Sequence, residues 1–571
     1  MQSHHRFVLL LLSIVIFLSA CSGPVSEPTE PAAPTAGVAP TSALGDASGL
    51  FATPEPASSN TTSVPTTSAS AEASSLATIV VQRDGPTQPF NRQLLGVNVP
   101  AWLSQQRLSN PQVITRTVAL GTPLLRLPGG SWSNSYDWEA CEIGDEKRCY
   151  WPWAARPTDF LKFLRATGRE AIWTVSINGT SKEAAALVAF FNGRVDDSTP
   201  IGVDVRGRDW LTIGHWASLR SKNGDPEPLK IKLWEVGNEV YGGKKGAGTG
   251  CVDWGWEDVW TCDGTEYVKG IGSGANRHEG YLEFRAAMRA VDPQIQVGAV
   301  GVDDPKGWSN WGDKVISAAG ADLDFYIVHL YAFSNTPTNA ESVLGMPQRT
   351  WARVMSNLNA AFDRVGGGRR VPVAVTEYNL IAFQDLDKSQ LMLRAVNALF
   401  IADTIGQMAE HGVSIANQWA LANGKAENGT DYGLIDADTN KRNPQYYALL
   451  LWSRFGNELL PVSSSLSAET TLSVYAGREA DGSITLLAIN KTDRPIGANV
   501  QIEPASGQFR GEVDTMQAAS LEAQDVRFNG VLNPSDPLSS VLAQSIGPLS
   551  SPFKQTFPPF SITLIRLSPT T

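Results

Sequence analysis

Two glutamates follow apolar segments of the chain in the same way. Glu239 comes after residues 231–237 and Asn238, and Glu377 comes directly after residues 371–376. If both segments are strands of a parallel barrel, the two side chains lie at the same end, because the carboxyl ends of such strands meet at one face. Two carboxyl groups can divide the cleavage of a glycosidic bond, one protonating the leaving oxygen while the other attacks the anomeric carbon. The spacing therefore predicts acid/base and nucleophilic chemistry.

The elements that must position these glutamates can be traced along the chain. Eight short apolar segments alternate with helical patterns, which predicts an α/β fold with a (β/α)8 TIM barrel over residues 94–458. The predicted strands span residues 94–99, 123–127, 171–177, 231–237, 296–300, 325–330, 371–376 and 413–419. By this count Glu239 closes the fourth strand and Glu377 closes the seventh.

The pattern changes in residues 459–571. Short alternating runs separated by turn signals such as Asp481-Gly482 predict a C-terminal antiparallel β-sandwich. A strand within residues 77–93 precedes the barrel and is expected to pair with this sandwich.

Composition and charge bear on the partners. The chain has 46 Lys and Arg against 57 Asp and Glu, a net charge of −11, and no basic run. Such a chain repels phosphate backbones, so we expect no nucleic-acid partner. It also has 17 Trp, whose flat apolar faces with one donor suit the faces of sugar rings. The tryptophans could simply belong to the core, but their number also fits a carbohydrate substrate.

With the barrel and its two glutamates in this order, the chain resembles glycoside hydrolase clan A. Barrels of that clan place Asn-Glu after the fourth strand as the acid/base and Glu after the seventh as the nucleophile. The resemblance implies that Glu239 is the acid/base, that Glu377 is the nucleophile, and that no metal or cofactor takes part. Asn238 is then placed to hold a sugar hydroxyl next to the reacting carbon.

Two further motifs resemble those of family 51, the α-L-arabinofuranosidases. Residues 125–138 read Leu-Arg-Leu-Pro-Gly-Gly-Ser-Trp-Ser-Asn-Ser-Tyr-Asp-Trp, similar to the second-strand motif in which an Arg supports the nucleophile, so Arg126 takes that role. Glu235 is an alternative or additional ion-pair partner for Arg126. The sixth strand ends in His329-Leu-Tyr331, similar to the His-x-Tyr of the family, whose Tyr hydrogen-bonds the nucleophile. We expect His329 to support the site by hydrogen bonding.

Other residues at the predicted strand ends are candidates for binding the sugar. The predicted substrate-binding residues are Asn134, Asn178, Gln418 and Trp419. Asn178 could equally close a turn. The tryptophans predicted to lie in loops or at strand ends, where each could pack or form a sugar platform, are Trp132, Trp138, Trp254, Trp256, Trp260 and Trp419.

The chain departs from the family 51 pattern at two places. Ser131 stands where those enzymes usually have Asn after Gly-Gly, and residues 96–102 lack the substrate-binding Glu that follows their first strand. The catalytic pair is therefore predicted more firmly than the sugar. An α-L-arabinofuranosidase-like activity on plant-type polysaccharides or oligosaccharides leads, and an endo-β-1,4-glucanase or xylanase of the same clan is the alternative. A non-catalytic surface glycan-binding lipoprotein is a third reading.

The N-terminal residues carry an export pattern. Residues 1–21 combine a short basic start with an apolar run and end in Leu-Ser-Ala-Cys, which resembles the bacterial lipobox with Cys21 as the lipid anchor. An ordinary signal cleavage with an incidental Cys is the alternative. Residues 22–76 are rich in Pro, Ser, Thr and Ala and predict a disordered spacer. We therefore expect an exported, cell-surface lipoprotein that contacts the membrane only through its anchor.

The remaining cysteines form two short-range pairs. In an exported protein they predict disulfides between Cys141 and Cys149 and between Cys251 and Cys262. A zinc site is disfavoured because CxxC spacing is absent. The acidic residues near the second pair lack the spacing of a calcium loop and are expected to be solvated. They are Asp253, Glu257, Asp258 and Asp263.

Overall fold

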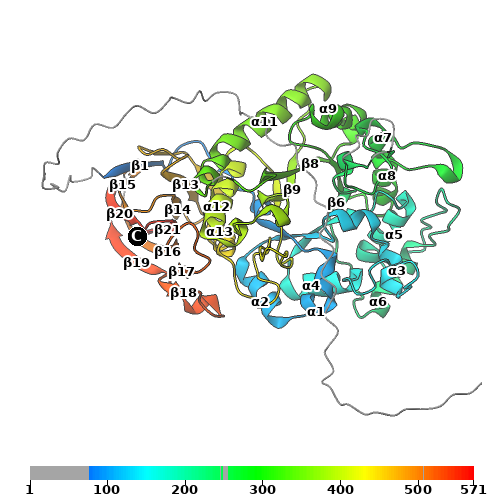
Figure 1. Ribbon diagram of the computed structural model, residues 1–571, viewed down its shortest axis with the longest axis horizontal. Coiled ribbons are helices and arrows are strands. Elements are labelled where there is room, and N and C mark those ends of the chain that lie inside the picture. Colours follow the sequence, from blue (N-terminus) through cyan, green and yellow to red (C-terminus); the bar gives the residue numbers. More distant parts are fainter. Residues whose placement is uncertain (1–75, 245, 248–254, 338, 506, 571) are drawn as a thin grey trace, which may run out of the picture. The chain divides into compact units, whose positions relative to one another are not determined.

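The computed structural model describes residues 76–244, 246–247, 255–337, 339–505 and 507–570 (Figure 1). Within them, eight parallel strands close into a barrel in the order β10-β3-β4-β5-β6-β7-β8-β9. Their bounds are β3 (Gly96–Asn98), β4 (Leu124–Leu127), β5 (Glu170–Val175), β6 (Leu233–Val236), β7 (Gln296–Val300), β8 (Phe325–Phe333), β9 (Val373–Ile381) and β10 (Ile415–Gln418). The predicted TIM barrel is confirmed.

Two barrel strands are longer than the sequence predicts. β8 continues beyond residue 330 to Phe333, and β9 continues beyond residue 376 to Ile381. The two strands stay paired along this extension, with His329 opposite Glu377 and Tyr331 opposite Asn379. Glu377 and Tyr331 therefore lie within a paired ladder that fixes their backbones, and not in the loops that follow the strands.

Helices cover the outside of the barrel (Figure 1). Their bounds are α1 (Ser104–Leu108), α2 (Pro111–Leu120), α3 (Trp138–Ile143), α4 (Pro157–Thr167), α5 (Ser181–Asn192), α6 (Ile213–Lys222), α7 (Gly264–Lys269), α8 (Tyr281–Val291), α9 (Gly307–Ala319), α10 (Glu341–Leu344), α11 (Met346–Val365), α12 (Ala395–Glu410) and α13 (Pro444–Ser453). Local sequence sets their ends. In α2 the Asn110 side chain accepts hydrogen bonds from backbone N–H groups of the first turn, and Gly121, with φ of 76°, ends the helix.

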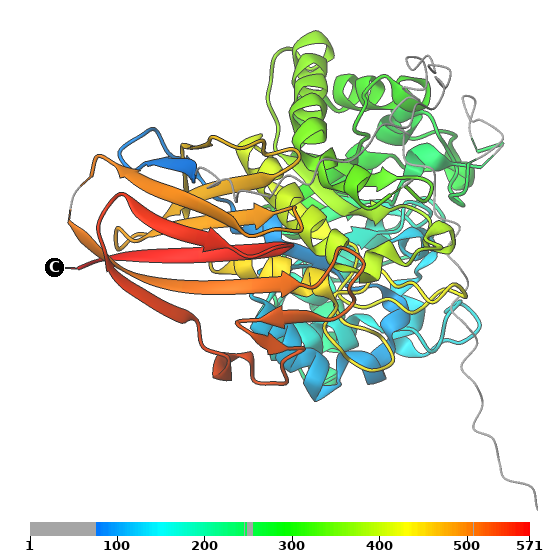
Figure 2. The same cartoon turned by 60° about the vertical axis from the view of Figure 1, so that its left-hand side comes forward.

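Two sheets follow the barrel (Figure 2). One has the order β12-β1-β15-β20, and the other has the order β18-β17-β16-β21-β14-β13-β11-β2, with β19 paired to β16. Their bounds are β1 (Ala77–Gln82), β2 (Gln88–Pro89), β11 (Glu458–Leu460), β12 (Val462–Ser464), β13 (Leu472–Arg478), β14 (Ile484–Asn490), β15 (Ile496–Glu503), β16 (Gln508–Ala518), β17 (Val526–Phe528), β18 (Val531–Leu532), β19 (Gln544–Leu549), β20 (Phe553–Phe557) and β21 (Ser561–Thr570). β1, which precedes the barrel, pairs antiparallel with β12 and parallel with β15.

The larger sheet is apolar on both faces. In β14, Ile484 and Leu486 belong to the core shared with the four-stranded sheet, whereas Leu487 and Ile489 belong to the core of the barrel and its helices. Successive side chains of a strand point to opposite faces. This sheet is therefore the layer that joins the sandwich to the barrel, in contact with α12 and α13.

The inside of the barrel changes from apolar to charged along its strands. An apolar cluster fills one layer and consists of Leu124, Ile172, Leu233, Phe325, Ile327, Ala374 and Ile415. Two residues farther along three of the same strands lie Arg126, Thr174 and Glu235, all buried. Residues two apart on a strand face the same side. The charged layer therefore rests on the apolar one, toward the end of the barrel that carries the glutamates.

The cysteine and terminal predictions have different outcomes. Cys141 and Cys149 form a disulfide, with their Cα atoms 4.8 Å apart. The predicted bridge between Cys251 and Cys262 involves Cys251, which lies outside the described residues, as do Cys21 and the predicted signal segment. Over the described part of the chain, no helix has the length and apolar character needed to cross a membrane.

Candidate active site

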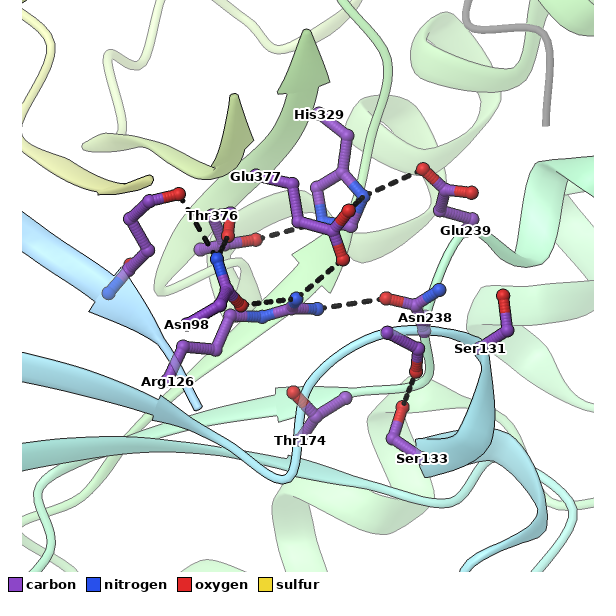
Figure 3. A network of polar contacts seen from close by, with 12 residues as sticks. Asn98, Arg126, Ser131, Ser133, Thr174, Asn238, Glu239, His329, Thr376 and Glu377 are labelled. Atoms are coloured by element: carbon purple, nitrogen blue, oxygen red, sulfur yellow. Dashed lines mark hydrogen bonds and ion pairs between the residues drawn. The ribbon is translucent and has the colours of Figure 1, made fainter. Parts of the chain in front are cut away.

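The two glutamates meet at the carboxyl end of the barrel strands (Figure 3). A carboxylate oxygen of Glu239 and one of Glu377 lie within 4.8 Å of each other, and both residues are buried. Glycosidases in which one carboxylate attacks directly hold the pair about 5 Å apart, whereas those that place a water between the carboxylates hold them about 6.5 to 9.5 Å apart. The separation found here suits direct attack by a carboxylate.

Glu377 accepts one hydrogen bond on each carboxylate oxygen. Nη1 of Arg126 donates to Oε1 over 2.8 Å, and the hydroxyl of Tyr331 donates to Oε2 over 2.8 Å. Burial and the charge of Glu377 raise the pKa of Tyr331 well above its usual value, so Tyr331 stays protonated and remains a donor. Glu377 is thus held in one orientation by two donors, as a nucleophilic carboxylate requires.

Arg126 links four side chains of the barrel interior, and Figure 3 shows its contacts with Glu377, Asn98 and Asn238. Besides Glu377, it donates from Nε to Glu235 over 2.7 Å, from Nη2 to Asn238 over 2.9 Å and from Nη1 to Asn98 over 3.0 Å. Burial acts to lower the pKa of Arg126, but the charges of Glu235 and Glu377 outweigh it, and the pKa is raised. Both roles considered for Arg126, support of Glu377 and ion pairing with Glu235, are found together.

Glu239 reaches the site through a break in the backbone after β6. The strand ends at Val236, and Gly237 and Glu239 have φ of 79° and 42°, in the left-handed region. A non-glycine residue is uncommon there, and such backbones cluster at functional sites. This turn lets Glu239 approach Glu377 although its strand is shorter than β9.

The carboxyl group of Glu239 is held from both sides. Nδ1 of His329 lies 2.9 Å from Oε1, and Nε1 of Trp256 donates to Oε2 over 3.1 Å. The other ring nitrogen of His329 lies 3.0 Å from Oγ1 of Thr376. His329 therefore orients Glu239 by hydrogen bonding. Glu239 contacts no cationic Arg or Lys among the described residues, whereas Glu377 contacts Arg126, so the two carboxyl groups have unequal surroundings.

The Pro-Gly-Gly turn after β4 requires both of its glycines. Gly129 and Gly130 have φ of 64° and 70°, a region that disfavours side chains. A Cβ on Gly130 would lie 2.7 Å from the ring of Trp419, and one on Gly129 would lie 3.2 Å from Oδ1 of Asn98. The turn therefore passes close over the site, between Arg126 and the aromatic residues beyond it.

Glu257 is the residue at this site that the sequence interpretation placed wrongly. It was expected in a solvated acidic loop, yet it is only 1% exposed. It accepts hydrogen bonds from Ser131 over 2.6 Å, from Asn134 over 2.8 Å and from Asn238 over 3.2 Å. Burial, followed by the charge of Glu239, raises the pKa of Glu257 to about 8.

The other acidic residues of that predicted cluster are dispersed. Asp258 has a side chain that is 85% exposed, whereas Asp263 caps α7 and pairs with Lys314. Asp253 lies outside the described residues.

Two predicted substrate-binding asparagines instead hold the backbone of the site. The Asn134 amide accepts from the N–H of Asn238 and donates to the carbonyl of Asn238 and to Glu257, so its polar atoms are already engaged. Asn178 donates to the carbonyls of Asn134 and Asp258. Both side chains thus link loops that are distant in the sequence, and their predicted contact with the sugar stays a prediction.

The eighth strand brings the side chains of Gln418 and Trp419 into the interior beside the site. Gln418 is fully buried, and its amide nitrogen donates to the carbonyl of Trp419 over 2.8 Å. Its carbonyl oxygen has no hydrogen-bond partner among the described residues. Trp419 packs beside Gly130 and is buried. Neither side chain presents an open sugar platform.

Aromatic rings lead away from the Pro-Gly-Gly turn toward the surface. Adjacent ring centroids are 3.9 to 5.8 Å apart along Trp419, Trp102, Trp132, Trp151 and Tyr150. Trp419 and Trp132 are buried, Trp102 and Trp151 are partly exposed, and Tyr150 at the end of the row is 77% exposed. Of the tryptophans predicted near the rim, Trp132, Trp138, Trp260 and Trp419 are buried, Trp256 contacts Glu239, and Trp254 lies outside the described residues.

One group of side chains has a geometry that a metal ion could use. Glu239, His329 and Glu377 each offer a ligand atom, and these atoms lie within 4.8 Å of one another. Glu377 already accepts from Arg126 and Tyr331 on its two oxygens, and the guanidinium charge beside it disfavours a second cation. Acid/base and nucleophilic chemistry therefore fits the site better than metal binding.

Comparisons with known proteins agree with this fold. No protein-family model matches the chain. Alpha-L-arabinofuranosidase C of Emericella nidulans is 25% identical over 248 residues, 40% of this chain and 41% of that protein. The alignment thus spans about two fifths of the length of this curated relative.

Solved structures match over more of the chain. An alpha-L-arabinofuranosidase from Thermotoga maritima, in an arabinose complex, aligns with 86% of this chain and 99% of its own, with a TM-score of 0.63 and 22% identity. A xyloglucanase of glycoside hydrolase family 44 from Paenibacillus polymyxa covers 86% and 99%, with a TM-score of 0.56 and 14% identity. These likenesses show that the barrel with its appended β-sheets is a fold shared with both proteins.

Proposed function

We propose that the protein is a retaining glycoside hydrolase. The observation that carries the proposal is the pair Glu239 and Glu377, whose oxygens lie within 4.8 Å of each other in unequal surroundings. One carboxylate is held by Arg126 and Tyr331, and the other is held by His329 and Trp256. A double displacement needs such a pair, with one charged nucleophile and one carboxyl group that exchanges a proton.

The reaction proceeds in two balanced steps. A carboxylate oxygen of Glu377 bonds to the anomeric carbon as the bond from that carbon to the leaving oxygen breaks, and Glu239 gives its proton to that oxygen. Water then attacks the anomeric carbon, Glu239 takes a proton from the water, and the ester bond to Glu377 breaks. Both carboxyl groups return to their starting states, and the anomeric configuration is retained.

The leading substrate class is α-L-arabinofuranosides of plant-type polysaccharides or oligosaccharides. The motif from Arg126 through Gly130 supports it, as does the similarity to proteins described as alpha-L-arabinofuranosidases. A panel of aryl glycosides is the direct test, and the aryl α-L-arabinofuranoside is expected to be hydrolysed fastest. If no member of the panel is hydrolysed while glycans still bind, the protein is a non-catalytic glycan-binding protein and the proposal is wrong.

The nucleophile is tested with the Glu377→Gln variant. Its activity on the best substrate should fall by several orders of magnitude, because an amide cannot form the glycosyl ester. Substantial turnover by a folded Glu377→Gln protein would refute the assignment.

An endo-acting β-1,4-glucanase or xylanase is the second candidate. The outer end of the aromatic row, at Trp151 and the exposed Tyr150, favours it, because aromatic rings outside the reaction centre suit an extended sugar chain. The size of the products separates the candidates. Single pentoses support the first, and oligosaccharides support the second.

We also propose that the protein is exported and anchored through Cys21. The Leu-Ser-Ala-Cys sequence and the preceding apolar run support this proposal. In a bacterial host supplied with labelled palmitate, the full chain should take up label and collect with membranes. The Cys21→Ser variant should do neither, and equal labelling of the two proteins would refute the anchor.

A further inference from the structure

A short segment, residues 255–257, contacts both members of the Asn238-Glu239 pair. The backbone N–H groups of Trp256 and Glu257 donate to the carbonyl of Gly242 over 2.8 and 2.9 Å. From there the Trp256 side chain reaches Glu239, and the Glu257 side chain reaches Asn238. One segment thus touches the proposed acid/base and the residue that precedes it.

Glycines make this close approach possible. A Cβ on Gly242 would lie 2.6 Å from the ring of Trp256, and a Cβ on Gly255 would lie 1.9 Å from the carbonyl oxygen of Gly243. Real Cβ atoms do not approach backbone so closely. The sequence at these positions therefore brings Glu257 into the interior, where a carboxyl group is costly unless it is hydrogen-bonded.

Glu257 is hydrogen-bonded at both of its oxygens. Ser131 and Asn238 donate to Oε1, and Asn134 donates to Oε2. These donors lie just after β4, the strand that carries Arg126, and just after β6, the strand that leads to Glu239. Glu257 therefore ties together the two strand ends on which the site is built.

The contact to Asn238 fixes which way its amide points. Arg126 can only donate, so it requires the amide oxygen of Asn238, and the distance is 2.9 Å. Glu257 accepts from the amide nitrogen at 3.2 Å. One of the two hydrogens of that nitrogen is thereby used, and the described residues offer no partner for the other.

We propose that Glu257 is a positioning residue that holds the Asn238 amide with its free N–H toward the substrate hydroxyl next to the anomeric carbon. The inference rests on the proposed glycosidase function and deepens it, because it makes that hydroxyl a determinant of specificity. A hydrogen bond to this hydroxyl strengthens as positive charge develops on the sugar ring. Loss of Glu257 therefore weakens the transition state more than the bound ground state.

The test uses two aryl glycosides that differ only in the hydroxyl next to the anomeric carbon. With Glu257→Ala, kcat/KM for the hydroxylated substrate should fall about 10-fold, the effect of losing one buried hydrogen bond between neutral groups. The fall should be mainly in kcat. For the deoxy substrate it should be less than about 3-fold, because that substrate cannot use the Asn238 contact.

Two further variants keep the test decisive if Glu257→Ala folds poorly. Glu257→Gln keeps the shape of the side chain but sets an NH2 group against one of the present donors. Its kcat/KM for the hydroxylated substrate should therefore lie between the values for the wild type and for Glu257→Ala. Glu142→Gln is the matched control, because Glu142 is also buried and hydrogen-bonded, to Thr158 and Asn223, outside the site. The Glu142→Gln variant should leave kcat/KM unchanged for both substrates.

The outcomes separate the inference from the function on which it rests. Equal losses on the two substrates, or no loss, would overturn the role of Glu257 while the wild type remains an active glycosidase. A wild type that hydrolyses neither substrate nor any other aryl glycoside would overturn the proposed function and the inference with it.

Discussion

Replacing Tyr331 with Phe removes a single hydrogen bond from the proposed nucleophile. The bond joins the Tyr331 hydroxyl to Oε2 of Glu377 over 2.8 Å, and both side chains are buried. Hydrogen bonds to charged groups contribute about 1.5 to 3 kcal/mol. At about 1.4 kcal/mol for each factor of ten, their loss slows the affected step about 10- to 150-fold.

The affected step is the breakdown of the glycosyl ester. There the Glu377 carboxylate leaves as an anion, and Tyr331 stabilises the charge as it develops. Attack by Glu377 is less sensitive, because its charge diminishes during that step. We therefore expect the Tyr331→Phe variant to lose more in kcat than in kcat/KM and to accumulate the glycosyl ester.

Rapid mixing with an aryl glycoside that has a good leaving group measures both steps. The variant should release a burst of aryl alcohol close to one equivalent per site, followed by slow turnover, and intact mass should show the sugar adduct. Tyr378→Phe is the matched control, because Tyr378 is buried next to Glu377 and its hydroxyl has no hydrogen-bond partner in the described part of the chain. If kcat of Tyr331→Phe stays within twofold of this control, the reasoning fails.

Three further predictions follow from other contacts. The Glu239→Ala variant should hydrolyse aryl glycosides slowly and regain activity with added azide, which needs no acid/base help, and a complete lack of recovery would contradict the acid/base role. The raised pKa of Glu257, about 8, means that the folded state binds a proton that the unfolded state releases near its usual pKa of 4.5. The stability of the wild type should therefore decline relative to Glu257→Gln as pH rises from about 4.5 to 8, by up to about 5 kcal/mol, and parallel urea unfolding curves across this range would contradict it. The Lys491→Met variant should lose about 3 to 5 kcal/mol in urea unfolding, because it leaves the buried Asp403 carboxylate without its cationic partner. The double variant Lys491→Met with Asp403→Leu should regain most of the lost free energy of unfolding. If the single and the double variant are equally stable, the reasoning is contradicted.

The strand-end glutamates could be predicted because local patterns specify them. Apolar runs mark barrel strands, and two-residue alternation places Glu235 on the same side as Leu233, toward the interior. The same alternation places Arg126, two residues after Leu124, on the interior side of its strand. What the patterns could not specify is how far β8 and β9 extend, because pairing between the two strands, and not local propensity, keeps the ladder going to Phe333 and Ile381.

The role of Glu257 could not be predicted from its neighbourhood in the sequence. It lies among acidic residues with no periodic apolar pattern, which favours a solvated loop. Its burial depends on distant partners, Ser131 and Asn134. The only local signal is the glycine at 255 together with Gly242 and Gly243, and its meaning is evident only once the two segments are seen in contact.

The strands β16 to β19 carry a weaker sequence signal than the barrel strands, for a different reason. In β16 the burial alternates strictly over its first residues, so every second side chain is exposed and polar. β19 is largely exposed along its whole length. Without a dense apolar run, such strands resemble loops in sequence. Their extended backbone is stabilised by pairing with β21 and with each other.

The charge of Arg126 is shared between two carboxylates, and this sharing matters for the proposed nucleophile. Glu235 is fully buried one layer below, where it accepts from Nε of Arg126 over 2.7 Å and from Thr174 over 2.7 Å. Glu377 therefore faces a guanidinium whose charge is already partly balanced. If Arg126 paired with Glu377 alone, it would stabilise the free carboxylate more than the uncharged glycosyl ester. The barrier to attack by Glu377 would then be higher. The buried Glu235 thus lets Arg126 orient Glu377 without holding it back, so the layer beneath the site contributes to the chemistry above it.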